Sequence, residues 1–197
     1  MKVASIILVG GKSLRLGRSK AEEVFDGKSL IERVMERLRP LTSQFLIVTS
    51  REQSELSFTD EAEILTDLYP SKGPLVGIYT GLLASRSAHS IVVACDMPFL
   101  NIELLRHMIK LTGDFDAVVP RIGEKMIEPL HAIYSKSCLD KIKTRLEHNR
   151  LGVNSFLSTV QVRYVEREEC QRLDPQLLSF FNINYQSDLD QAIGIVE

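Results

Sequence analysis

The sequence lacks an excess of charge of either sign, and this limits the partners that the protein can have. Its 197 residues include 24 lysines and arginines and 26 aspartates and glutamates, which gives a formal net charge of −2. A chain with this balance has no global basic field to attract DNA, RNA or an anionic membrane. Any anionic ligand must therefore be bound by a local group of cations, and we expect no nucleic acid or membrane partner.

Cysteine pairs and long hydrophobic runs are also missing. Cys95, Cys138 and Cys170 are odd in number, widely spaced and form no C-x-x-C pair, which argues against a disulfide framework and a zinc cluster. The apolar run at residues 3–9 is too short for a signal peptide or a membrane span. We therefore expect a cytoplasmic protein in which residues 3–9 form a buried strand.

Apolar runs and amphipathic segments alternate along most of the chain, whose length suits one domain with a full hydrophobic core. Continuous apolar runs are typical of parallel strands that are covered on both faces. Over residues 1–197 the alternation predicts a single-domain α/β fold, a Rossmann-like, doubly wound, mostly parallel sheet with a late antiparallel strand near residues 160–165. The expected strands are 3–9, 45–49, 63–66, 91–95 and 116–119, and the expected helices are 30–38, 102–111, 136–146 and one that begins at Pro74.

Gly77 and Gly81 stand four positions apart in the helix that begins at Pro74. Glycine destabilises a helix relative to alanine, so a glycine inside a helix usually has a structural reason. We interpret this pair as a packing feature that lets the helix backbone approach the sheet closely.

A basic, glycine-containing segment follows the first expected strand. Residues 8–20 (LVGGKSLRLGRSK) hold three glycines and four basic residues. Glycines let backbone N–H groups face phosphate oxygens, and ligands bind at the carboxyl ends of parallel strands. The basic side chains can offset phosphate charge. The segment therefore indicates a phosphate site, and the alternative is a solvated basic loop.

This segment does not match the common nucleotide-binding motifs. A Walker A loop requires a glycine five positions before its Gly-Lys-Ser triplet. The sequence has Ile6 at that place for the triplet beginning at Gly11, and Glu22 for the one beginning at Gly27. The G-x-G-x-x-G fingerprint of dinucleotide-binding proteins is absent as well.

Asp96 and Asp67 each follow an expected strand. Asp96 comes directly after the run 91–95, where a carboxylate beside a phosphate loop is suited to Mg²⁺, a cation that takes one or two carboxylates plus substrate phosphates. Asp67 could accept hydrogen bonds from a guanine or a ribose. Alternatively, both aspartates only begin turns, Asp96 toward Pro98 and Asp67 toward Pro70. His131 heads a strand-like segment, where a lone histidine is more often structural than catalytic, and substrate binding is the weaker alternative for it.

In this order the segments resemble the molybdenum cofactor guanylyltransferase family, within the nucleotidyltransferases of the sugar-nucleotide pyrophosphorylase type. The family signature LAGGxSxRMGxxK is similar to residues 8–20, with Val9, Leu16 and Ser19 where Ala, Met and Asp are usual. The resemblance runs from end to end of the chain. Further matching segments are GPLVGI at 73–78, ACDMPFL at 94–100, EPLHA at 128–132 and FNIN at 181–184.

The resemblance implies a nucleotide-diphospho-sugar transferase type of fold and a set of site residues. It implies that Asp96 is the metal ligand for Mg²⁺ and also contacts the nucleotide. Arg15, Lys20 and Asp96 are the implied catalytic residues, whereas the roles of Asn182 and Asn184 stay open. The implied GTP site consists of Leu8, Val9, Gly10, Gly11, Lys20, Asp67 and Asp96.

The implied activity is the Mg²⁺-dependent transfer of GMP from GTP to the terminal phosphate of molybdenum-molybdopterin, with release of pyrophosphate. The expected partners are GTP, the pterin phosphate and molybdoenzyme-maturation proteins, and the expected state is a monomer. A cytidylyltransferase for the same cofactor, a transferase for another phosphorylated acceptor and a non-catalytic cofactor-delivery protein remain as alternatives. Base selectivity is open because some relatives use an Asn after the second strand, where this chain has Thr49, Ser50 and Arg51.

Overall fold

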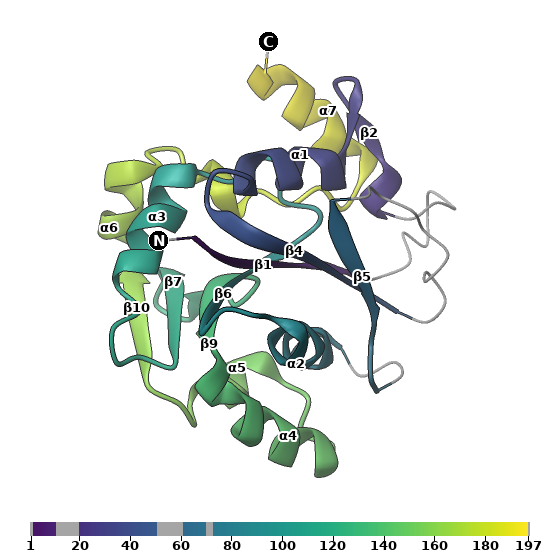
Figure 1. Ribbon diagram of the computed structural model, residues 1–197. Coiled ribbons are helices and arrows are strands. Elements are labelled where there is room, and N and C mark those ends of the chain that lie inside the picture. Colours follow the sequence, from purple (N-terminus) through teal and green to yellow (C-terminus); the bar gives the residue numbers. More distant parts are fainter. Residues whose placement is uncertain (1, 11–19, 51–60, 70–72, 197) are drawn as a thin grey trace.

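The computed structural model describes residues 2–10, 20–50, 61–69 and 73–196, with only the backbone of Lys20, Phe25 and Val196. A central sheet of eight strands has the order β10-β7-β9-β6-β1-β4-β5, and β8 pairs with β7 (Figure 1). The strands are β1 (Val3–Val9), β4 (Thr42–Thr49), β5 (Ala62–Thr66), β6 (His89–Ala94), β7 (Ala117–Gly123), β8 (Met126–Ile127), β9 (His131–Ser135) and β10 (Val162–Glu166). A separate hairpin joins β2 (Val24–Phe25) and β3 (Lys28–Ser29).

The sheet is mostly parallel, as the sequence predicts, but its antiparallel strands are β8 and β9 rather than the late segment, which forms β10. β1 runs parallel to β4 and β6, β4 runs parallel to β5, and β10 runs parallel to β7. β9 runs antiparallel to both β6 and β7. The chain turns back tightly from β7 into β8 and on into β9, and a tight turn forces the antiparallel direction, whereas β10 follows a long helical connection.

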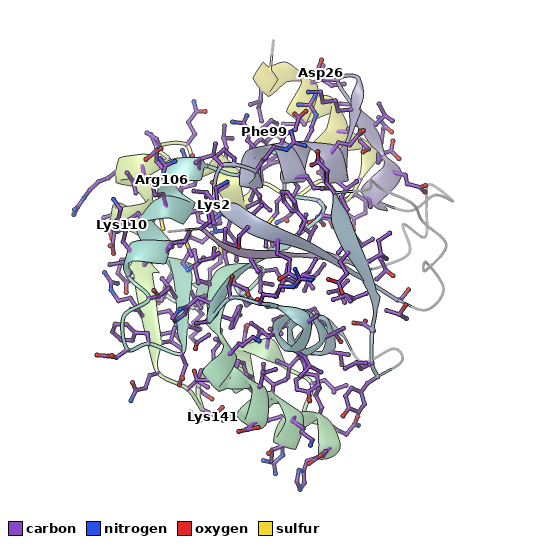
Figure 2. The ribbon with its side chains drawn as sticks, viewed as in Figure 1. Lys2, Asp26, Phe99, Arg106, Lys110 and Lys141 are labelled. Atoms are coloured by element: carbon purple, nitrogen blue, oxygen red, sulfur yellow. The ribbon has the colours of Figure 1, made fainter. Side chains whose placement is uncertain are left out.

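Helices cover both faces of the sheet, which confirms the doubly wound arrangement. One core cluster joins the sheet to α1 (Leu30–Leu38), α3 (Ile102–Lys110) and α6 (Arg167–Leu173). The other joins it to α2 (Pro74–Ala84), α4 (Leu139–Glu147) and α5 (Val153–Leu157). Figure 1 shows α1 and α2 on opposite sides of the sheet, and Figure 2 shows side chains filling both layers while Lys110 and Lys141 lie on the outside.

The central strand β1 explains why its sequence is an unbroken apolar run. All seven of its residues are buried. Ile7 and Val9 belong to the cluster under α1, whereas Ile6 and Leu8 belong to the cluster under α2. Since successive side chains of a strand point to opposite faces, a strand covered on both sides needs apolar residues at every position.

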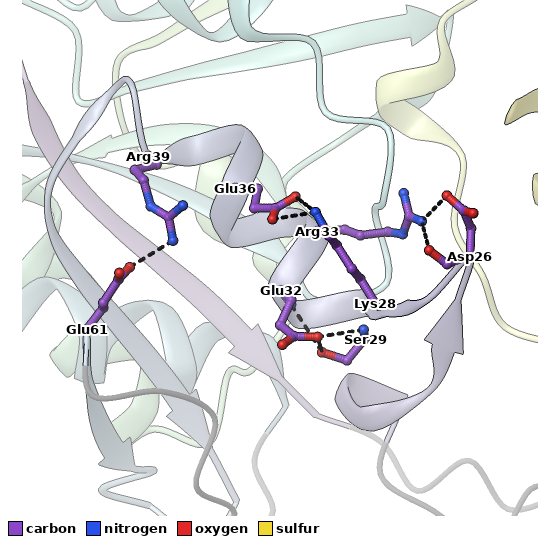
Figure 3. A network of polar contacts seen from close by, with 8 residues as sticks. All are labelled: Asp26, Lys28, Ser29, Glu32, Arg33, Glu36, Arg39 and Glu61. Atoms are coloured by element: carbon purple, nitrogen blue, oxygen red, sulfur yellow. Dashed lines mark hydrogen bonds and ion pairs between the residues drawn. The ribbon is translucent and has the colours of Figure 1, made fainter.

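Polar contacts fix α1 and the hairpin before it (Figure 3). Ser29 caps the helix in a capping box: the Glu32 N–H donates to Ser29 Oγ, and the Ser29 N–H donates to Glu32 Oε2 at 2.8 Å. Such a cap stabilises a helix by about 1 kcal/mol, whereas an exposed ion pair contributes about 0–1 kcal/mol. The exposed pairs are Lys28–Glu36 at 2.7 Å, Arg33–Asp26 at 2.6 Å and Arg39–Glu61 at 2.9 Å.

The C-terminal segment packs against α1, and the three cysteines lie in the interior. α7 (Gln186–Val196) forms a small third cluster, in which Ile183, Leu189 and Ala192 pack with Leu30 of α1. The three cysteines are buried thiols. Within the described ranges, no helix combines the length and the apolar character that a membrane span requires.

The two glycines of α2 confirm the packing interpretation. An ideal Cβ at Gly77 would lie 2.9 Å from Leu8 Cδ2, and one at Gly81 would lie 2.5 Å from Ile6 Cγ2. Both distances are shorter than van der Waals contact, and Ile6 is fully buried. The helix therefore lies against β1 at a distance that only glycine permits.

We expect Gly81→Ala to destabilise the protein relative to a matched substitution, Gly194→Ala in α7. Both changes gain the same helix propensity, but the space around Gly194 is open to 4 Å. Overpacking against Ile6 costs about 1–3 kcal/mol, so the two variants should differ by that amount in the free energy of unfolding measured with denaturant. Equal stability of the two variants would show that α2 can shift away from the sheet.

Candidate functional site

A pocket of about 470 Å³ opens at the carboxyl edge of the sheet. The strands β6, β1, β4 and β5 are neighbours and parallel, so their carboxyl ends meet at this edge. In open α/β sheets this is the edge at which ligands bind. The lining residues come from these strand ends, from the start of α2 and from the turn before β9: Leu8, Val9, Gly10, Val48, Ser50, Asp67, Gly73, Pro74, Gly77, Ala94, Asp96 and Leu130.

The pocket brings together residues that the sequence predicts for the nucleotide site. Leu8, Val9 and Gly10 line it at the end of β1, and Asp67 and Asp96 line it at the ends of β5 and β6. The predicted residues Gly11 and Arg15 lie outside the described residues. Of Lys20, the structure describes the backbone, which begins the short helix η1 (Lys20–Glu22).

The two aspartates stand on different strands of this edge, three strand intervals apart. From β6 to β5 the polar and small residues just beyond the strand ends are Asp96, Gly10, Ser50 and Asp67, and Asp96 stands two residues past the end of β6. Adjacent strands lie about 4.8 Å apart, so the three intervals between β6 and β5 span about 14 Å. Ligands of one Mg²⁺ all lie about 2 Å from the ion. The two carboxyl groups are therefore placed to contact different parts of a bound ligand.

Asp67 is a carboxyl group that is partly shielded from water. Its N–H donates to the Thr49 carbonyl at 2.9 Å, which fixes the backbone at the end of β5. Its Oδ1 atom is buried and accepts no hydrogen bond from the described residues. Burial raises the pKa of Asp67 from its usual 3.8 to about 6. Because an unsatisfied buried acceptor is costly, a ligand that donates N–H groups here is favoured.

The space beside Asp67 is created by a residue that lacks a side chain. An ideal Cβ at Gly77 would lie 3.7 Å from Asp67 Oδ1. Gly73, at the N-terminus of α2, has a φ of 76° and leaves its surroundings open to 4 Å. The small residues of α2 therefore form one wall of the pocket and leave room for a ligand between Leu8 and Asp67.

Asp96 is positioned by its backbone. The Ile183 N–H donates to the Asp96 carbonyl at 2.9 Å, and the neighbouring Cys95 N–H donates to the Leu8 carbonyl at 3.1 Å. These bonds connect the turn after β6 to β1 and to the segment before α7. The FNIN segment at 181–184, which resembles the family pattern, therefore lies against Asp96.

The oxygen ligands at this edge fit Mg²⁺ if a phosphorylated ligand supplies the rest of the coordination. Among the described residues no group of three metal-ligating side chains occurs. Mg²⁺ is usually held by one or two carboxylates together with substrate phosphates and water. A single aspartate, Asp96, next to the start of a basic segment at Gly10 matches that pattern.

Several lining residues were not predicted for the site from the sequence. Val48, Ser50, Ala94 and Leu130 are at strand ends or in the turn before β9. The sequence signal that could have identified them is their position at or near the ends of the expected strands. Pro74 was predicted only as the start of a helix, and Gly77 only as a packing residue.

His131 is a core residue. Its side chain is fully buried, and neither ring nitrogen has a hydrogen-bond partner among the described residues. Burial lowers its pKa from 6.5 to about 4, so the ring is neutral at physiological pH. Its ring contacts Phe180 edge-on, with centroids 5.0 Å apart. The structure therefore favours the structural role over substrate binding.

Known proteins share this fold. The crystal structure of molybdopterin-guanine dinucleotide biosynthesis protein A from Archaeoglobus fulgidus has a TM-score of 0.81 and 32% identity, and the match covers 98% of both chains. A 2-C-methyl-D-erythritol 4-phosphate cytidylyltransferase from Thermus thermophilus has a TM-score of 0.74 at 14% identity, with 99% of this chain and 98% of that chain covered, and so shares the fold alone.

The sequence relatives are more specific. A molybdenum cofactor guanylyltransferase from Desulfosudis oleivorans is 35% identical, with 99% of this chain and 96% of that protein covered. A probable molybdenum cofactor guanylyltransferase from Methanosarcina mazei is 38% identical, with 97% of this chain and 90% of that protein covered. The MobA-like NTP transferase domain matches residues 5–165. The chain therefore belongs to the molybdenum cofactor guanylyltransferase family of MobA-like NTP transferases.

Proposed function

We propose that this nucleotidyltransferase moves GMP from GTP to the terminal phosphate of molybdopterin, releasing pyrophosphate and forming a guanine dinucleotide of the cofactor. The observation that carries the proposal is the single pocket in which Asp67, Gly10 and Asp96 follow one another along the carboxyl edge of the sheet. Family membership and the names of the relatives supply the choice of guanine and of the pterin acceptor.

The order of these residues suggests how GTP lies in the pocket. The guanine base binds at Asp67, because a carboxylate accepts hydrogen bonds from both the ring N–H and the amino group of guanine. Leu8 and Val48 supply apolar surface for the base. The phosphates lie at the other end, near Gly10, where backbone N–H groups can face them.

Charge stabilisation is the main task at the phosphate end. Asp96 and the phosphates would hold Mg²⁺, which would supply positive charge to offset the charge on the α-phosphate of the transferred GMP. Arg15 and Lys20 add fixed cations, and Gly10 permits close approach of the backbone. The attacking group is an ionised phosphate, so the chain needs to provide orientation and charge but no general base.

The residue that follows Lys20 supports the role proposed for this lysine. Ala21 is fully buried against α1, where it belongs to the cluster that also holds Val9. η1 is therefore anchored on the face of the sheet that α1 covers. A cation at the start of η1 suits the triphosphate that enters from Gly10.

We expect Lys20→Ala to weaken GTP binding about tenfold to a hundredfold, because a charge-assisted hydrogen bond is lost. The melting temperature should change little, since lysine rarely belongs to a hydrophobic core. Titration calorimetry with GTP and Mg²⁺ measures the affinity, and Lys143→Ala on the exposed face of α4 is the matched control. A collapse of the melting temperature together with normal GTP affinity would make Lys20 a structural residue.

A further inference from the structure

We propose that Glu128 recognises the acceptor: its carboxylate accepts hydrogen bonds from the N–H groups of a 2-amino-4-oxo pyrimidine edge, the edge that a pterin shares with guanine. The inference rests on the proposed function, which supplies a pterin as the acceptor. It assigns a role to the first residue of the EPLHA segment at 128–132.

Backbone hydrogen bonds fix Glu128 between β8 and β9. Its N–H donates to the Pro120 carbonyl at 3.0 Å, and its carbonyl accepts from the His131 N–H at 3.1 Å, which closes a turn. Within that turn Leu130 lines the pocket, and its carbonyl accepts from the Ala94 N–H at 3.1 Å, two residues before Asp96. Glu128 is therefore held at the same edge of the sheet, beyond Asp96 and on the side away from Asp67.

The surroundings of Glu128 resemble those of Asp67 more than those of a surface carboxylate. Its side chain is partly buried, and burial alone raises its pKa. Neighbouring acids on β10 and α6 behave differently, because Glu166 pairs with Arg121 and Glu169 pairs with Arg163, and the pKa of each is lowered. No cation among the described residues pairs with Glu128, so ligand N–H groups would offset its loss of hydration.

The positions of the two carboxyl groups match the chemistry of the product. Four strand intervals separate β9 from β5, about 19 Å at 4.8 Å per interval. A dinucleotide of guanine and a pterin carries the same 2-amino-4-oxo edge on the heterocycle at each of its ends, with the phosphates between them. Along this edge of the sheet, Asp96 and Gly10 stand between Asp67 and Glu128. Guanine binds to Asp67, and the pterin binds to Glu128.

The test compares two free pteridines that differ at one position. Pterin-6-carboxylate carries a 2-amino group, which can donate to the Glu128 carboxylate. Lumazine-6-carboxylate carries a 2-oxo group at the same position, which would place an acceptor oxygen against the Glu128 carboxylate. With GTP and Mg²⁺ present, the wild type should bind the pterin about tenfold to a hundredfold more tightly than the lumazine, as measured by ligand fluorescence. In Glu128→Gln the two affinities should fall within about twofold of each other, because an amide offers only one acceptor oxygen and adds donors.

The controls separate this inference from the proposed function. Glu124→Gln, an exposed change in the nearby β7–β8 turn, should keep the preference for pterin, and Glu128→Gln should keep the wild-type affinity for GTP. Glu128→Asp keeps a carboxylate and should keep part of the preference, which covers the case that Glu128→Gln folds poorly. An unchanged pterin preference in a folded Glu128→Gln variant, or no preference in a wild type that transfers GMP, would overturn the role of Glu128 alone. A wild type that transfers no GMP would overturn the proposed function as well.

Discussion

Replacing Asp96 with asparagine should lower kcat by about two to three orders of magnitude and leave the fold intact. Loss of the metal ligand withdraws several kcal/mol of transition-state stabilisation, and each 1.36 kcal/mol is about tenfold in rate. Asparagine keeps the size and the turn-forming ability of aspartate. The hydrogen bond from Ile183 goes to the backbone carbonyl of residue 96, so the substitution does not remove it.

A magnesium titration of kcat distinguishes the metal role from a turn-forming role. Low activity that recovers partly at high Mg²⁺ would support Asp96 as the ligand, because the weakened site then fills by mass action. Asp140→Asn, an exposed change at the start of α4, is the matched control. Wild-type turnover by the Asp96 variant at ordinary Mg²⁺ would reduce Asp96 to the start of a turn.

The second large effect is expected at Asp67. Asp67→Asn should weaken GTP binding about tenfold to a hundredfold and remove most of the preference for GTP over CTP, because an amide cannot accept both N–H groups of the guanine edge. The affinities of both nucleotides can be measured by calorimetry with Mg²⁺ present. A variant that keeps the wild-type ratio of GTP to CTP affinity would place base recognition elsewhere in the pocket.

The raised pKa of Asp67 makes GTP binding by the wild type depend on pH. The carboxylate form, which accepts both hydrogen bonds, is lost as the pH falls through about 6. GTP affinity should therefore drop between pH 7.5 and pH 5, by at most about tenfold per pH unit. Asp67→Asn should flatten that part of the profile, and a profile of the same shape in both proteins would assign the dependence to another group.

The same substitution should act in the opposite direction on stability. Because the pKa of Asp67 is higher in the folded state than its usual 3.8, the group stabilises the fold below pH 3.8, and this contribution is lost as the pH rises through about 6. At pH 7.5 the variant lacks a desolvated charge and should be more stable by on the order of 1 kcal/mol, after allowance for the partial exposure of the side chain. If Asp67→Asn binds GTP more weakly and is also more stable, Asp67 serves ligand binding at a cost in stability.

The parts of the fold that the sequence predicted well depend on local patterns. The strand Val3–Val9 and the helix Leu30–Leu38 have the predicted bounds, because one is apolar at every position and the other has an apolar stripe with a capping serine. The grouping of the aspartates at strand ends was also predictable, because parallel strands bring their carboxyl ends to one edge of the sheet.

Other features depend on contacts between distant residues. The direction of β9 follows from the turn after β7 and from the place of β9 between β6 and β7, which no local periodicity specifies. The hydrogen bond between Ile183 and Asp96 joins residues far apart in the chain. The burial of Asp67 and Glu128 could not be predicted either, because it depends on α2 and on the turn before β9.

The most direct test of the account is a transfer assay with wild-type protein, Mg²⁺ and each of the four nucleoside triphosphates labelled on the α-phosphate, with and without molybdopterin. We expect label from GTP to enter a dinucleotide only when the pterin phosphate is present, with one pyrophosphate released per dinucleotide. Equal incorporation from CTP would contradict the guanylyl assignment. Binding of GTP and pterin without any transfer would contradict catalysis and favour a cofactor-delivery protein.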